Sequence, residues 1–199
     1  MPLDIWLAFA AASFVVVVIP GPTILLVVSY ALTQGRRVAM ATAMGVALGD
    51  FIAVSLSLAG LGAILLTSAW AFTALKWIGA AYLVFLGIKL LRSPPHLEDV
   101  AAPTPTPAKR IFAHSALVTA LNPKGIIFII AFVPQFLSAD IPVMPQFLIM
   151  LVTFVSLGAA NAMAYALLAD QLGRRIRNPK VMTWVNRTGG TTLIAMGIL

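Results

Sequence analysis

Asp50 and Lys124 are ionisable side chains inside long apolar runs of the sequence, where their chemistry would take place away from bulk water. Asp50 lies about 12 residues into a run that starts near Val38, and Asn122-Pro123-Lys124 interrupts a later run. At about 1.5 Å per residue, each lies roughly 16–20 Å into its run, near the middle of a bilayer. A charge at that depth is costly unless it is paired or hydrated, so both are candidate functional residues. The alternatives are that Asp50 only braces a neighbouring helix and that Lys124 extends its ammonium to the membrane surface.

A motif of two prolines around a glycine, Pro20-Gly21-Pro22, interrupts the first apolar run at a similar depth. Proline removes a backbone hydrogen bond and clashes with the preceding turn, so this motif should open the helix locally, as should Asn122-Pro123. Backbone groups freed in lipid need partners within the protein or a watery cavity. The positive N-terminal end of each half-helix that resumes there would suit a substrate carboxylate. A simple packing kink is the alternative at the first motif.

Two patterns with a spacing of four residues add small and polar faces. Ala41, Gly45 and Gly49 form a small-residue ladder of the kind that lets helices approach closely, which packing alone would explain. Asn161 and Tyr165 form a polar stripe on a later run. This stripe either faces the same cavity as Asp50 or makes an interhelical hydrogen bond.

The elements that must position these residues are membrane helices. The chain has 199 residues, 61% hydrophobic and only 10% charged, whereas a soluble domain is about half apolar and a quarter charged. About 20 apolar residues cross a bilayer core. We expect six helices, at about 5–32, 38–66, 69–91, 111–137, 147–168 and 184–199. The last run is barely long enough to cross a bilayer, so the position at which this helix ends on the outer side is not predicted.

The six runs divide into two halves of three, residues 1–92 and 111–199, joined by a proline-rich linker at 93–110. Both halves have a proline interruption in their first run, and residues 79–88 and 189–198 share the pattern G-small-x-x-L-aliphatic-x-x-G-I. Related halves with three spans each must be inverted in the membrane, as in many secondary transporters. We therefore predict an all-α integral membrane protein of two inverted three-helix repeats, with helices 1 and 4 broken at proline.

The charges predict the orientation of the chain. The formal net charge is +7, from 13 Lys and Arg against 6 Asp and Glu. Eleven of the basic residues flank the loops on one side: Arg36, Arg37, Lys89, Arg92, Lys109, Arg110, Arg174, Arg175, Arg177, Lys180 and Arg187. By the positive-inside rule the linker is cytoplasmic and both termini are outside. The positive charge thus indicates an anionic membrane face and no nucleic-acid partner.

Several chemistries lack their residues in this sequence. There is no cysteine, which excludes disulfides, thiolate metal sites and thiol redox relays. Neither H-E-x-x-H nor G-x-S-x-G occurs, so a zinc protease and a serine hydrolase are unsupported. We predict neither an enzyme nor a cofactor.

Taken in order, the motifs resemble those of the lysine-exporter superfamily, which includes homoserine and threonine exporters. The resemblance covers essentially the whole chain. It rests on Pro20-Gly21-Pro22, Gly35-Arg36-Arg37, Gly45-x-x-x-Gly49-Asp50, Gly79-Ala80-Ala81-Tyr82-Leu83 with Gly87 and Lys89, and Asn122-Pro123-Lys124. The resemblance implies a multi-pass protein of the bacterial inner membrane that exports amino acids or close derivatives, driven by the proton gradient.

In the mechanism predicted from the sequence, a mid-membrane site is exposed to the two sides in turn. Asp50 carries a proton or meets the substrate ammonium, and Lys124 or Asn122 meets the carboxylate. The expected partners are a small-molecule amino-acid substrate, protons and the lipid bilayer; formation of a homo-oligomer is left open. Two other functions remain: a non-transporting membrane scaffold, and export of a cation or metal, although the lack of cysteine and of membrane histidine disfavours soft metals.

Overall fold

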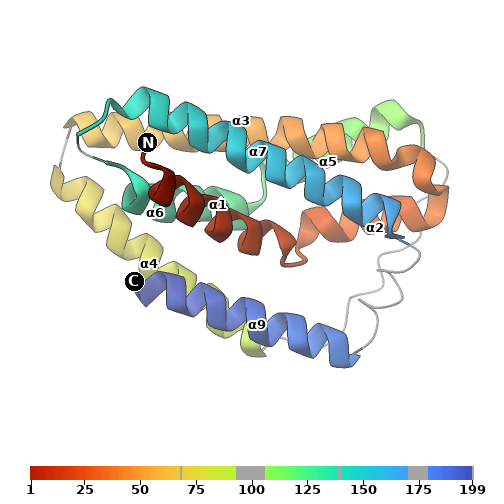
Figure 1. The fold of residues 1–199 in the computed structure, drawn as a ribbon. Coiled ribbons are helices and arrows are strands. Elements are labelled where there is room, and N and C mark those ends of the chain that lie inside the picture. The colour runs from red at the N-terminus through yellow and green to blue at the C-terminus, as the bar shows by residue number, and fades with distance from the viewer. Residues whose placement is uncertain (68, 93–105, 139, 170–178, 199) are drawn as a thin grey trace.

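The computed structural model describes residues 1–67, 69–92, 106–138, 140–169 and 179–198. All regular secondary structure in this part of the chain is helical, which confirms the predicted all-α class. The helices are α1 (Leu3–Val18), α2 (Pro22–Gln34), α3 (Ala39–Thr67), α4 (Ala69–Arg92), α5 (Ala108–Ala120), α6 (Pro123–Phe132), α7 (Val143–Leu167) and α9 (Pro179–Ile198), with 3-10 turns η1 (Arg36–Val38) and η2 (Val133–Phe136) (Figure 1).

Prolines determine where two of the helices stop and resume. α1 ends at Val18 because Ile19 precedes a proline and takes an extended conformation, with φ −61° and ψ 119°. α2 then begins with Pro22 at its first position, which suits a residue without an N–H. The axes of α1 and α2 are bent by 55°. A 43° bend separates α5 from the segment Pro123–Phe136, which also starts with proline.

The described helices differ in how well they meet the requirements for a membrane span. Two are long and apolar enough alone, at Arg36–Ile64 and Val143–Leu167, and four spans result if each bent pair counts as one. α4 offers a shorter apolar stretch, Ala80–Lys89, and α9 is more polar because it includes Lys180 and Arg187. The all-helical membrane architecture is supported, and the count of six spans stays a prediction.

Three predicted helix boundaries shift towards the N-terminus for one physical reason. α5 begins at Ala108 and α7 at Val143, each directly after a proline, and α9 begins with Pro179. Pro107 and Pro142 are the N-caps of α5 and α7, and Pro179 is the first residue of α9. The fixed φ of proline suits the start of a helix, so these helices start earlier than the apolar runs suggested. Of the linker predicted at 93–110, residues 93–105 lie outside the described residues. Its last three residues, 108–110, belong to the first turn of α5.

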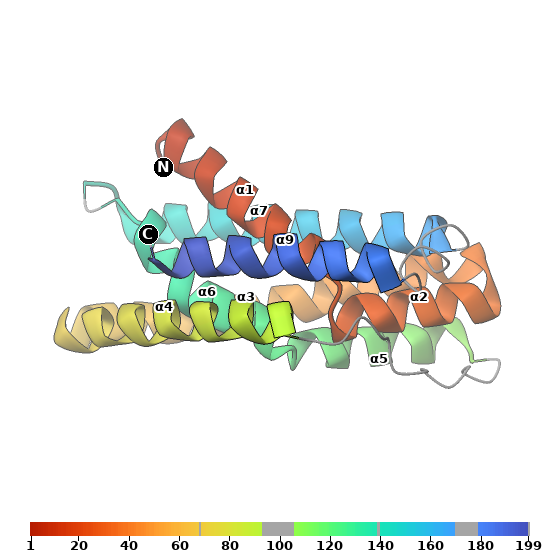
Figure 2. The ribbon, with the colours of Figure 1, turned by 90° about the horizontal axis from the view of Figure 1, so that it is seen from below.

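Glycines bring two pairs of helices into close contact. A side chain at Gly45 would lie 2.5 Å from the Phe112 carbonyl oxygen, and one at Gly49 would lie 2.5 Å from that of Ala116, so α3 packs backbone to backbone on α5. This confirms that the small-residue ladder allows close approach. The second contact joins α4 to α9, which lie side by side in both ribbon views (Figures 1 and 2). A side chain at Gly87 would lie 2.6 Å from the carbonyl oxygen of Gly190.

Buried apolar side chains form two large clusters along the bundle. The cluster nearer the two chain ends joins α1, α3, α6 and α7 and is rich in phenylalanine: Phe9, Phe128, Phe132, Phe147 and Phe154. The other joins α2, α3 and α7 and is mostly alanine: Ala31, Ala39, Ala43, Ala162, Ala166 and Ala169. Between the clusters, the two helix interruptions come together.

Candidate functional site

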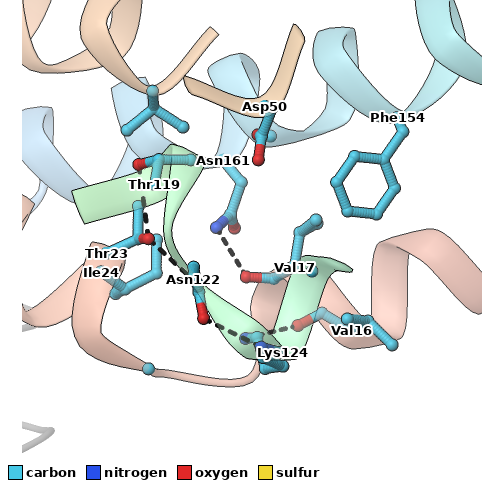
Figure 3. Close-up of a pocket in the computed structure, with 14 residues that line it drawn as sticks. Val16, Val17, Thr23, Ile24, Asp50, Thr119, Asn122, Lys124, Phe154 and Asn161 are labelled. Atoms are coloured by element: carbon cyan, nitrogen blue, oxygen red, sulfur yellow. Dashed lines mark hydrogen bonds between the residues drawn. The ribbon is translucent and has the colours of Figure 1, made fainter. Parts of the chain in front are cut away.

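A pocket lies where both interrupted helices meet α3 and α7. It encloses about 420 Å³ of unfilled volume, including space open to the outside. Its polar lining comes from five helices: Thr23 of α2, Asp50 of α3, Thr119 of α5, Asn122 and Lys124 at the start of α6, and Asn161 of α7 (Figure 3). Polar groups from segments far apart in sequence therefore converge between the two apolar clusters.

The prolines of the first motif leave carbonyl groups of α1 without their usual donors. In a continuous helix, Val16 would accept from residue 20 and Val18 from residue 22, but both are prolines and have no N–H. Lys124 supplies the first missing donor: its Nζ donates to the carbonyl oxygen of Val16 at 2.9 Å and to that of Ile19 at 2.7 Å. An ammonium from α6 thus satisfies the end of α1.

The two polar residues of α7 satisfy the remaining carbonyls of this end. Asn161 Nδ2 donates to the carbonyl oxygen of Val17 at 2.9 Å, and the Tyr165 hydroxyl donates to that of Val18 at 3.1 Å. Asn161 also lines the pocket, whereas Tyr165 bonds just beyond it. The stripe therefore combines the two expected roles, because its residues bond between helices and one of them faces the cavity.

Asn122 links the two interruptions. Its Oδ1 accepts from the backbone N–H of Lys124 at 3.1 Å and so caps α6, while its Nδ2 donates to Thr23 Oγ1 at 3.1 Å. The Thr119 hydroxyl also donates to Thr23 Oγ1, at 3.4 Å. Thr23 and Thr119 were not among the predicted site residues. The available signals were that Thr23 directly follows the Pro-Gly-Pro motif and that Thr119 precedes Asn122 by about one turn.

Asp50 differs from the other polar groups of the pocket. Its carboxylate makes no hydrogen bond with any of the described residues, and it lies across the pocket from Lys124 in Figure 3 without an ion pair between them. The carboxylate packs against Gly158 of α7, where any side chain would collide with Asp50 Oδ2. Asp50 is therefore a partly buried acid with a free face towards the cavity.

The start of α2 provides positive potential at the same pocket. Its cap, Gly21, and the first-turn residues Thr23 and Ile24 all line the cavity. The N–H groups of Thr23 and Ile24 have no acceptor in the described part of the chain, and no side chain caps this end. Unsatisfied amides and the helix dipole together favour an anion at such an end.

The pocket brings together five of the predicted site residues: Gly21, Asp50, Asn122, Lys124 and Asn161. The other four adjoin it: Pro20, Pro22 and Pro123 at the interruptions, and Tyr165 beside the end of α1. Gly158 and the α1 carbonyls were not predicted. Within the described ranges, no three His, Asp or Glu side chains are grouped so that they could hold a metal ion.

The sequence model of the protein family described as "LysE type translocator" matches residues 14–199 of this chain. The chain belongs to this family. This confirms the resemblance seen in the motifs, and it makes the protein a member of a translocator family and not an enzyme. No solved structure matches the chain.

Relatives of this LysE-type chain include efflux proteins. It is 35% identical to an "Uncharacterized membrane protein" of Vibrio cholerae, over 100% of this chain and 97% of that one. It is 31% identical to the homoserine/homoserine lactone efflux protein of Salmonella typhimurium over the same shares. It is 33% identical to the leucine efflux protein of Salmonella choleraesuis, over 70% of this chain and 66% of that protein.

Proposed function

We propose that this LysE-type protein exports amino acids or close derivatives across the bacterial inner membrane through the pocket described above. The observation that carries the proposal is the unpartnered Asp50 carboxylate facing a cavity that also holds the free amides of α2. Opposite charges on the two sides of one pocket are complementary to a zwitterion. The names of the homoserine and leucine efflux relatives support this substrate class.

In the proposed complex, the substrate ammonium binds Asp50 and its carboxylate binds the N-terminal end of α2. The amides of Thr23 and Ile24 are free to donate to it. Asn122 uses both ends of its amide within the protein, and Lys124 uses two of its three N–H bonds on α1. Their contribution to the carboxylate is therefore secondary to that of the helix end.

Asp50 is also the proposed coupling residue. A carboxyl group within the membrane is costly as an anion, and proton relays in transporters use such groups. Because the Asp50 carboxylate accepts no hydrogen bond from the described residues, it is free either to hold a proton or to bind an ammonium. Competition between the two would couple inward proton flow to outward substrate movement.

The arrangement of the helices supports an inverted repeat with alternating access. α1–α2, α3 and α4 correspond in order to α5–α6, α7 and α9, and the first member of each set is bent at a proline. The helix contacts follow the same correspondence. α3 packs on α5, and its counterpart α7 packs on α1 and α2, which are the counterparts of α5 and α6. The counterparts α3 and α7 also pack on each other, as do α4 and α9. The pocket lies between the phenylalanine-rich and alanine-rich clusters, so loosening one at a time would open it to one side.

The two ends of the bundle support the proposed orientation. The beginning of α1 and the end of α9 lie towards one end, whereas the α2–α3 junction, with Arg36 and Arg37, and the first turn of α5, with Lys109 and Arg110, lie at the other (Figure 1). Under the positive-inside rule the basic end is cytoplasmic and both termini are periplasmic.

The proposal is tested with purified protein in liposomes loaded with labelled homoserine, leucine or a divalent metal. We expect efflux of at least one amino acid, accelerated by a proton gradient directed into the liposomes, and no metal efflux above protein-free liposomes. A scaffold would release none of these solutes, and a cation exporter would release the metal alone. Either result would overturn the proposal.

A further inference from the structure

Lys124 occupies a position that is unfavourable for its own helix. It is the second residue of α6, directly after Pro123, and so lies at the positive end of that helix. Its side chain carries the ammonium away, to the negative C-terminal end of α1, where it bonds to the carbonyls of Val16 and Ile19. The last turn of α1 has no basic residue of its own. The charge is therefore matched to α1, which lies more than 100 residues earlier in the chain.

The surroundings of the ammonium favour this match over a role as a counter-ion. Asp50 lies across the pocket and makes no ion pair with Lys124. Of the α7 polar groups, Asn161 and Tyr165 are occupied with the neighbouring carbonyls of Val17 and Val18. Carbonyls at the end of an interrupted membrane helix are groups that can coordinate a monovalent cation. At the end of α1, the Lys124 ammonium occupies the position that such a cation would take.

We propose that Lys124 is a positioning residue whose ammonium acts as a tethered cation, holding the C-terminal end of α1 to α6. The broken helix then needs no bound metal ion at this end. The inference rests on the proposed function in one respect: we expect the Lys124 ammonium to let go of the C-terminal end of α1 during transport. Its structural part can be tested without any transport measurement.

The test measures how accessible the end of α1 is. The sequence contains no cysteine, so Ile19→Cys introduces a single thiol, at a side chain that is 6% exposed. A membrane-permeant maleimide should label this thiol slowly in purified protein. Adding Lys124→Met, which keeps the length of the side chain but removes the charge, should raise the labelling rate at least about tenfold, as expected for the loss of hydrogen bonds to a charged group. Adding Lys124→Arg should restore slow labelling to within about threefold.

Two further variants control for general loosening and for misfolding. Lys109→Met is the same substitution at an exposed lysine and should leave the labelling rate unchanged. Tyr165→Phe removes only the hydroxyl bonded to Val18, so it keeps the test possible if Lys124→Met does not fold. It should raise the labelling rate about two- to fivefold.

Transport kinetics separate positioning from substrate binding. With labelled homoserine and leucine, Lys124→Met should lower the maximal efflux rate at least tenfold and change the half-saturating concentration less than threefold. Unchanged labelling together with a tenfold higher half-saturating concentration would overturn the inference and make Lys124 a carboxylate ligand. If wild-type protein transports neither amino acid but the labelling results hold, the proposed function fails and the structural role of Lys124 stands.

Discussion

Replacing Gly158 with alanine should displace the Asp50 carboxylate without changing its chemistry. The new methyl group would collide with Asp50 Oδ2 and lie 3.3 Å from its Cγ. Contacts between carbon and oxygen are seldom much shorter than about 3.3 Å, so the carboxylate must move by about 1 Å. It can do so by rotating into the pocket, because no described residue bonds it in place. A displacement of this size can lower the rate of a positioned reaction about 100-fold.

We therefore expect Gly158→Ala to lower the efflux rate roughly 10- to 100-fold. Overpacking costs about 1–3 kcal/mol, and the gain in helix propensity offsets up to about 1 kcal/mol of this. At about 2–4 °C per kcal/mol, the melting temperature should fall by less than about 12 °C. The assay is efflux of labelled amino acid from liposomes, with protein folding checked by size-exclusion chromatography and thermal unfolding.

The matched control is Gly60→Ala, the same change within the long helix α3. A side chain there meets no atom within 4 Å, so efflux should stay at the wild-type rate. If folded Gly158→Ala protein exports as fast as Gly60→Ala protein, the position of the carboxylate has no role, and the account of the site is wrong.

Three further predictions concern packing, the link between the interruptions, and orientation. Gly49→Ala should destabilise the protein by about 1–3 kcal/mol in thermal unfolding, because its methyl group would meet the backbone of α5 at 2.5 Å; an unchanged melting temperature would contradict the close helix contact. Asn122→Ala should cost about 1 kcal/mol through the lost cap of α6, and Asn122→Asp should recover most of it, since it keeps the acceptor; equal losses in both variants would contradict a capping role. A reporter domain that is active only in the cytoplasm should be active when inserted within residues 93–110, and one that is active only in the periplasm should be inactive there; activity of the periplasmic reporter would reverse the proposed orientation.

Residue spacing predicted the helical class and several of the polar groups that line the pocket. Long apolar runs predicted the helical class, and the position of Asp50 in such a run predicted an acid at a pocket. α1 ends just before Pro20, where the ladder of backbone hydrogen bonds cannot continue, and the break of one membrane helix at this point stays a prediction. These features follow from local chemistry, which a sequence shows directly.

The partners of the freed backbone groups could not be predicted. The sequence shows that Pro20 and Pro22 cannot donate, but it does not show which distant side chain replaces them. That depends on how α6 and α7 pack on α1, which places Lys124 on Val16. The role of Gly158 was hidden for the same reason, because a glycine in a helix gives no sign of which side chain it accommodates.

The account depends most directly on whether Asp50 couples proton flow to export. The decisive measurement compares wild-type and Asp50→Asn protein in liposomes, using efflux driven by an imposed proton gradient and exchange of labelled for unlabelled amino acid. Asparagine keeps the size of the side chain but cannot exchange a proton. We predict that folded Asp50→Asn protein loses the acceleration by the proton gradient while retaining measurable exchange. Efflux accelerated as in the wild type would contradict the account and would leave Asp50 a structural residue.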